Sequence, residues 1–246
     1  MDGLFSRRSA AFVIGVVTSM VVMTGCNSDA ASTGIRQQAG IVEITPPAWI
    51  GGEQPVLRHR LDAARGRLWT LTAAGVELYD AAARKRLARI ELPGWLWVDE
   101  PYSYPPDLAI GPDGEAVISS NVVPTLWRVD PVTLAVSEHA LLLDDNTGRD
   151  IGFTGLAYSA QQGAYFAISP FRSSLWRIDP LLRRGQHIPL SAPLLNARGL
   201  GIRARASAQR ASRFVGLCIP TDRDGLLVDL APDQRSGYVR PGICSS

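Results

Sequence analysis

The sequence predicts an all-β fold assembled from four repeated units of four strands each. The clearest observation is that Leu126-Trp127-Arg128-Val129-Asp130-Pro131 is nearly copied 49 residues later as Leu175-Trp176-Arg177-Ile178-Asp179-Pro180. Fainter copies occupy residues 76–80 and 226–229, so Asp80, Asp130, Asp179 and Asp229 lie 50, 49 and 50 residues apart. A fixed period of this length is typical of an array of supersecondary units.

The second repeat shows what each unit contains. Its expected strands are residues 107–110, 116–119, 126–129 and 134–142, with turns at Gly111-Pro112-Asp113-Gly114 and at Asp130-Pro131. The strands are rich in apolar, β-branched and aromatic residues, and the turns are rich in Gly, Pro and Asp. Because Asp80, Asp130, Asp179 and Asp229 recur in every unit, we expect them to form turns.

The other repeats follow the same pattern. Their expected strands are 60–62, 68–71, 76–79 and 87–92 in the first, 155–158, 164–168, 175–178 and 186–190 in the third, and 199–202, 213–218, 226–228 and 238–239 in the loosest, the fourth. The inner strands are apolar on both faces, whereas the outer strands carry charges such as Arg89 and Glu138. Such a sheet needs a neighbour on each face, as in the blades of a small β-propeller. We expect four blades, or five if residues 41–58 form another. A β-sandwich with coincidental repetition is the alternative.

Residues 107–114 and 155–163, each followed by a Leu-Trp-Arg-Val/Ile-Asp-Pro strand, carry a family resemblance. They resemble repeats of the NHL, gluconolactonase-like (senescence marker protein) and quinoprotein-like propellers, over residues 59–240. Resemblance to the gluconolactonase-like class implies a metal held by Glu, Asn and Asp side chains from separate blades. Glu100, Asp107, Asn146 or Asn196 could take those parts, but no motif fixes any of them, so no catalytic residue is assigned.

The N-terminus has the pattern of an export signal. Arg7 and Arg8 precede an apolar run over residues 10–23 that ends at Thr24-Gly25-Cys26. The segment Met23-Thr24-Gly25-Cys26 resembles the lipobox of bacterial lipoproteins, which implies cleavage before Cys26 and acylation, palmitate included, of that cysteine. An uncleaved membrane helix is the alternative, although the run is shorter than the roughly 20 residues that span a bilayer.

The expected organisation is therefore a signal peptide over residues 1–25, a lipidated tether over 26–40 and a propeller domain over 41–246. Acyl chains on Cys26 would hold the domain on a membrane. The expected location is extracytoplasmic, on the periplasmic side, with the outer membrane as the favoured membrane.

Two further cysteines, Cys218 and Cys244, remain for the exported domain. An even pair in an oxidising compartment predicts a disulfide, which would stabilise the fold by roughly 3 to 4 kcal/mol. The alternative is a buried free thiol at Cys218 and a frayed tail that carries Cys244.

Charge and motifs exclude several functions. The chain has 25 basic and 23 acidic side chains, and this balance gives no argument for a nucleic-acid partner. It contains no Gly-x-Ser-x-Gly or His-Glu-x-x-His motif. His59, His139 and His187 lie in or beside expected strands, where a structural role is expected.

Loops that link an outer strand to the next inner strand are where propellers bind. Trp95, Trp97, Tyr102 and Tyr104 crowd into one such loop together with Glu100. They predict either a lid or a ligand-binding surface. A later loop contributes two more candidate ligand-binding residues, Asn196 and Arg198.

The loop between these two places oxygen ligands at Asp144, Asn146 and Asp150, the spacing of a calcium loop. It lacks an acidic residue at Gly155, where such a loop would end, so a solvated acidic turn is the favoured interpretation. No cofactor is expected otherwise.

The leading interpretation is a membrane-anchored lipoprotein whose propeller binds an envelope protein or a small ligand. The alternative is a lactonase or esterase-type hydrolase that uses a divalent cation such as calcium.

Overall fold

The computed structural model describes residues 49–242, except 51–53, 100–103, 145–151, 170–172, 195–196, 198, 204–215, 221–224 and 231–235. The chain divides into two units, Met1–Gln37 and Gln38–Ser246, and all described residues belong to the second. The predicted signal peptide, Cys26 and the tether lie outside the described residues. Among those that are described, no helix is long and apolar enough to cross a membrane.

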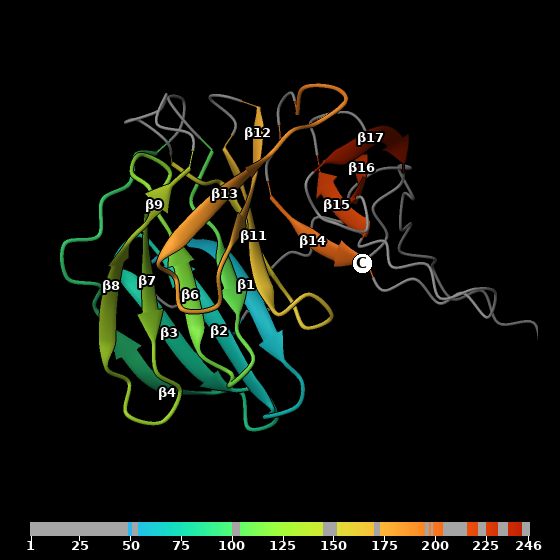
Figure 1. The fold of residues 1–246 in the computed structure, drawn as a ribbon. Coiled ribbons are helices and arrows are strands. Elements are labelled where there is room, and N and C mark those ends of the chain that lie inside the picture. Colours follow the sequence, from blue (N-terminus) through green and yellow to red (C-terminus); the bar gives the residue numbers. More distant parts are fainter. Residues whose placement is uncertain are drawn as a thin grey trace, which may run out of the picture. The chain divides into compact units, whose positions relative to one another are not determined.

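The described chain is all-β, as predicted, and each of the four repeats forms one antiparallel sheet (Figure 1). The first two sheets contain β1 (Val56–Asp62), β2 (Arg67–Thr72), β3 (Gly75–Asp80) and β4 (Lys85–Ile90), then β5 (Leu108–Ile110), β6 (Ala116–Ser119), β7 (Thr125–Val129) and β8 (Val136–Ala140). The third contains β10 (Gly155–Ser159), β11 (Ala164–Ser169), β12 (Ser174–Ile178) and β13 (Arg184–Ile188), joined by β9 (Leu142–Leu143). The fourth contains β14 (Gly201–Arg203), β15 (Gly216–Pro220), β16 (Gly225–Leu230) and β17 (Gly237–Gly242).

Successive sheets pack against one another and share apolar cores. Trp69 and Trp127 are buried in the core between the first and second sheets, and Trp176 lies in the core between the second and third. The first strands of successive sheets are also in contact, β1 with β5, β5 with β10 and β10 with β14. The described strands of the first and fourth sheets make no extensive contact with each other. This is the stacking expected of propeller blades, without closure of the ring.

The recurring aspartates form turns, as predicted, at the three positions whose side chains are described. Asp130 Oδ1 accepts hydrogen bonds from the backbone N–H of Val132 and Thr133 at 2.8 and 2.7 Å. Asp80 and Asp179 bind the backbone N–H groups of their own turns in the same way. These bonds fix the turn between the third and fourth strand of each of the first three sheets.

One strand differs from the prediction. Leu142 was expected to end the outer strand of the second repeat, but β9 instead pairs in parallel with β13 of the third sheet. Gly185 permits this, because a Cβ there would lie 2.7 Å from Leu143 Cδ2. The fourth sheet has the same arrangement, in which a leucine packs over a glycine. Leu190 pairs in parallel with Gly237, where a Cβ would lie 2.6 Å from Leu190 Cδ2.

Candidate binding site at the ends of the inner strands

A short polar segment, Ser119-Ser120-Asn121, begins at the last residue of β6 and organises one end of the second sheet. We call it the Ser-Ser-Asn segment. All three residues are fully buried. Ser119 Oγ accepts the backbone N–H of Asp107 at 2.9 Å and donates to the carbonyl oxygen of Phe153 at 2.8 Å. The segment thus joins the starts of the second and third inner strands.

The Ser-Ser-Asn segment also holds the aromatic loop, residues 95–104, of which 95–99 and 104 are described. Asn121 Nδ2 donates to the carbonyl oxygens of Val98 and Tyr104 at 2.6 and 2.9 Å, and Asn121 Oδ1 accepts the Val98 N–H at 3.0 Å. Trp95 Nε1 donates to the carbonyl oxygen of Ser119 at 3.0 Å. The loop is therefore fastened to Ser119 at Trp95 and to buried Asn121 at Val98 and Tyr104.

The fastened loop leaves apolar side chains in solvent. The Trp95 and Trp97 rings stack with their centroids 5.7 Å apart, and both are half-buried. Leu96 and Val98, which alternate with them, are 57% and 39% exposed. The loop thus packs on the second sheet with its inner side and exposes apolar side chains on its outer side. Ligand binding by these exposed side chains stays a prediction.

The second part of the site is a charge cluster at the start of β5. Asp107 is fully buried, and its carboxylate accepts the N–H groups of Leu108 and Leu156 at 2.8 and 2.9 Å. Arg60 Nη2 lies 2.9 Å from Asp107 Oδ1, and Arg58 Nε lies 3.6 Å from the same oxygen. One carboxylate therefore ties together three inner strands, β1, β5 and β10.

The cluster makes its surroundings electropositive. His59, between the two arginines, has its pKa lowered from 6.5, first by burial and then by the charges of Arg60 and Arg58. Asp62, the acidic residue of β1, is held by Arg65, with Arg65 Nη1 3.2 Å from Asp62 Oδ2. Asp107 is a carboxylate that both guanidinium groups approach.

The structure locates some of the candidate ligand residues and not others. Trp95, Trp97 and Tyr104 come together with Asn121 as described above. Glu100, Tyr102, Asn196 and Arg198 lie outside the described residues. Their placement in the site stays a prediction.

The proposed calcium loop is described at Asp144 alone, because Asn146 and Asp150 lie outside the described residues. Asp144 Oδ1 accepts the backbone N–H of His187 at 2.8 Å, which caps the edge of β13. The described residues contain no group of three or more His, Cys, Asp and Glu side chains placed to hold a metal. The disulfide is likewise untested, since Cys244 and the side chain of Cys218 are not described.

The three histidines lie on strands, as predicted. His139 Nε2 is 2.9 Å from Ser137 Oγ on β8, and the ring of His187 on β13 lies 5.2 Å from that of Trp176. These contacts are structural.

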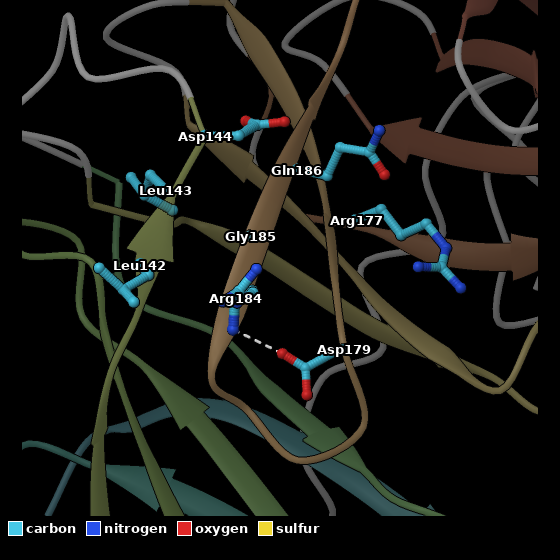
Figure 2. Close-up of a pocket in the computed structure, with 8 residues that line it drawn as sticks. All are labelled: Leu142, Leu143, Asp144, Arg177, Asp179, Arg184, Gly185 and Gln186. Atoms are coloured by element: carbon cyan, nitrogen blue, oxygen red, sulfur yellow. Dashed lines mark hydrogen bonds between the residues drawn. The ribbon is translucent and has the colours of Figure 1, made fainter.

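A groove of about 490 Å³ lies along β9, β12 and β13 of the third sheet (Figure 2). Its lining includes no residue of the Ser-Ser-Asn segment. It is lined by Leu142, Leu143, Asp144, Arg177, Asp179, Arg184, Gly185 and Gln186. Its two carboxylates already bind backbone N–H groups, Asp144 that of His187 and Asp179 those of its own turn. These bonds stabilise the edge of the sheet and the turn.

Sequence reasoning missed Arg58, Arg60 and the Ser-Ser-Asn segment. A signal was present for Arg58, Arg60 and Asn121, because these three residues have no counterpart in the next repeats, whereas Ser169 of the third repeat corresponds to a serine of the segment. The inner strands β5 and β10 carry no charged residue where β1 carries two arginines. A residue that recurs in every blade is expected to stabilise the blade. A residue found in one blade alone is instead a candidate for a role at a single site.

Comparison with known proteins gives structural likenesses alone. No protein-family model and no curated protein matches the chain. The major allergen Mala s 1 of Malassezia sympodialis is similar at 10% identity, over 77% of this chain and 79% of that chain, with a TM-score of 0.44. Virginiamycin B lyase from Staphylococcus aureus is similar at 14% identity, over 74% and 50%, with a TM-score of 0.43. Glutaminyl cyclase of Myxococcus xanthus is similar at 15% identity, over 76% and 72%, with a TM-score of 0.44.

This chain spans about half the length of the lyase. Because each of these TM-scores is below 0.5, the fold rests on the strand pairing described above, and the function rests on the residues of this chain.

Proposed function

We propose that the protein is an extracytoplasmic lipoprotein, anchored by Cys26, whose β-propeller is a binding module for an envelope protein or a small ligand. The observation that carries the binding role is the aromatic loop, in which buried Asn121 fixes the backbone while Leu96 and Val98 face solvent. A loop fixed before binding loses little conformational entropy on binding, so its apolar surface contributes more of its burial to affinity.

The composition of the loop supports the same role. Aromatic residues are enriched at the centres of protein interfaces, and Trp95 and Trp97 form a stacked pair beside the exposed aliphatic side chains. Tyr104, at the other end of the loop, is held by the same asparagine. The loop thus offers a compact apolar surface with a polar support.

The number of blades belongs to this proposal. Four sheets stack in sequence order, and a closed ring of four is one form that they could complete. The other is a fifth blade, for which residues 56–58 of the predicted 41–58 are not available, because they belong to β1 of the first sheet. Either form leaves the aromatic loop at the end of the second sheet.

The binding role is tested by placing a photoactivatable amino acid at Leu96 of the full-length protein in its own host. The matched control is the same amino acid at Val132, which is 83% exposed on a turn of the same sheet. We expect an adduct of one defined size from Leu96, no such adduct from Val132, and loss of the Leu96 adduct when Asn121→Ala is added. Equal labelling from both positions, or none from Leu96, would overturn the proposal.

Anchoring is tested separately by fractionation. Cys26→Ser should move the protein from the membrane fraction to the soluble fraction, because acylation needs the cysteine thiol. A variant that stays in the membrane fraction would exclude the lipid anchor.

A further inference from the structure

We infer that the aromatic loop inserts Leu96 and Val98 into the surface of a phospholipid bilayer, so that the ligand of the proposed binding site is membrane lipid. This inference rests on the proposed function and adds the chemical class of the ligand. It starts from the outer side of the loop, where Leu96 is 57% and Val98 is 39% exposed.

The first argument is that backbone groups of the loop are already hydrogen-bonded within the protein. Ser120 Oγ donates to the carbonyl oxygen of Leu96, and Asn121 binds both the N–H and the carbonyl oxygen of Val98. A backbone polar group that enters the acyl region without a partner is strongly unfavourable, because no water is present there to replace the lost bonds. These bonds therefore lower the cost of moving the two residues from water into lipid.

The second argument is the order of the side chains. Leu96 and Val98 alternate with the stacked rings of Trp95 and Trp97, which are half-buried. The indole N–H of Trp95 is bonded to the carbonyl oxygen of Ser119. Tryptophan is enriched where a protein meets the boundary between acyl chains and water, and aliphatic side chains enter the acyl region. The segment thus has the composition of a shallow membrane contact.

This pairing of exposed apolar side chains is confined to the loop. The other exposed large apolar side chains of the described residues stand singly in the sequence, at Leu61, Leu87, Val132, Leu142, Leu181 and Tyr238. Single exposed apolar residues are normal on a protein surface. Leu96 and Val98 are therefore the two that need a partner.

The third argument is the size of the surface. A stable protein interface buries about 800 Å² on each partner and involves about 20 to 30 residues a side. The described part of the loop offers two exposed apolar side chains. A bilayer sets no such requirement when a lipid anchor already holds the domain at the membrane, because insertion then becomes an intramolecular step.

The charge of the segment indicates which lipid it contacts. The charged residues between positions 91 and 99 are Glu91 and Asp99, both acidic and both exposed. Anionic lipids attract basic segments and repel acidic ones. The favoured surface is therefore that of zwitterionic phospholipid, and the contact depends on apolar insertion.

The test places a photoactivatable apolar amino acid at Leu96 of the full-length protein, reconstituted through its anchor in phosphatidylcholine vesicles. The matched control is the same amino acid at Leu181, which is 55% exposed on the turn after β12 and is held at the membrane by the same anchor. We expect an adduct with the mass of one phosphatidylcholine from Leu96, in a yield about tenfold above that from Leu181, because burial of the two side chains orients the domain.

A second measurement separates insertion from mere closeness to the membrane. With the photoactivatable amino acid at Val98, Leu96→Asp should lower the lipid adduct about tenfold, because a carboxylate is expelled from the acyl region. Leu181→Asp should leave that adduct unchanged. Added sodium chloride should also leave it unchanged, since salt screens charges and not apolar burial. Equal lipid adducts from Leu96 and Leu181, none from Leu96, or no effect of Leu96→Asp would overturn the inference.

The crosslink from Leu96 in the host keeps this inference separable from the proposed function. A protein adduct there, without excess lipid adduct in vesicles, would uphold the proposed binding role and overturn the lipid inference. A phospholipid adduct in both settings would support both. No adduct of either kind would overturn both.

Discussion

Replacement of Asn121 by alanine tests whether one buried side chain holds the aromatic loop. The substitution removes three hydrogen bonds, two to Val98 and one to Tyr104, at 2.6 to 3.0 Å. Each such bond contributes about 0.5 to 1.5 kcal/mol net. Water can rehydrate part of a loop whose Val98 is 39% exposed, so we expect a loss of about 2 to 3 kcal/mol in the free energy of unfolding.

The assay is urea denaturation together with deuterium exchange. The midpoint should fall with little change in its slope, and the amide of Val98 should lose its protection. The control is Thr133→Ala, which removes the exposed hydrogen bonds of the Thr133 hydroxyl to the Ala135 N–H and to Asp130 and should change stability by less than about 1 kcal/mol. A midpoint equal to that of the wild type, with Val98 still protected, would refute the argument that Asn121 fixes the loop.

Three further predictions concern backbone strain and pH. Gly75→Ala should cost more than about 3 kcal/mol, because its φ is +123° and a Cβ would lie 2.4 Å from a backbone oxygen of β4, whereas Gly66→Ala, in open space at φ +63°, should cost about 1 kcal/mol; equal urea midpoints would contradict this. Burial, followed by the charge of Glu115, raises the pKa of Tyr165 above 10.0, so its contribution to stability is present below that pH and lost above it; Tyr165→Phe should flatten the alkaline loss, and an unchanged profile would exclude this cause. The pKa of His59 is lowered below 6.5, so its contribution is present above that pH and lost as the pH falls through the lowered value; His59→Gln should reduce the loss between pH 7 and 5, and melting curves with the same acid slope as wild type would argue against it.

Much of the strand pattern could be predicted, because the repetition supplies independent copies of one local rule. The strand expected over residues 116–119 coincides with β6, and the Asp130 and Asp179 turns form as their residue types require. The pairing of β9 could not be predicted in this way. It depends on Gly185, more than forty residues away, whose missing side chain leaves room for Leu143.

In the candidate site too, features set by local sequence could be predicted and features set by distant contacts could not. Aromatic residues crowded into ten positions mark the loop in the sequence alone, but nothing local identifies Asn121 as its anchor, because the bonds cross from one strand end to a loop 17 to 23 residues earlier. The position of the loop could therefore be predicted from the sequence, but the hydrogen bonds that fix its backbone could not.

Arg58 and Arg60 show how a repeat sequence can still reveal a unique site. Alternation along β1 places both side chains on one side, and the repeat places β1 beside β5, whose first residue follows Asp107. A buried carboxylate without a partner would destabilise the fold, so its presence at Asp107 requires a cation from a neighbouring strand. Arg60 and Arg58 both approach that carboxylate, at 2.9 and 3.6 Å. They stand out when the repeats are compared, because the inner strands β5 and β10 carry no charged residue.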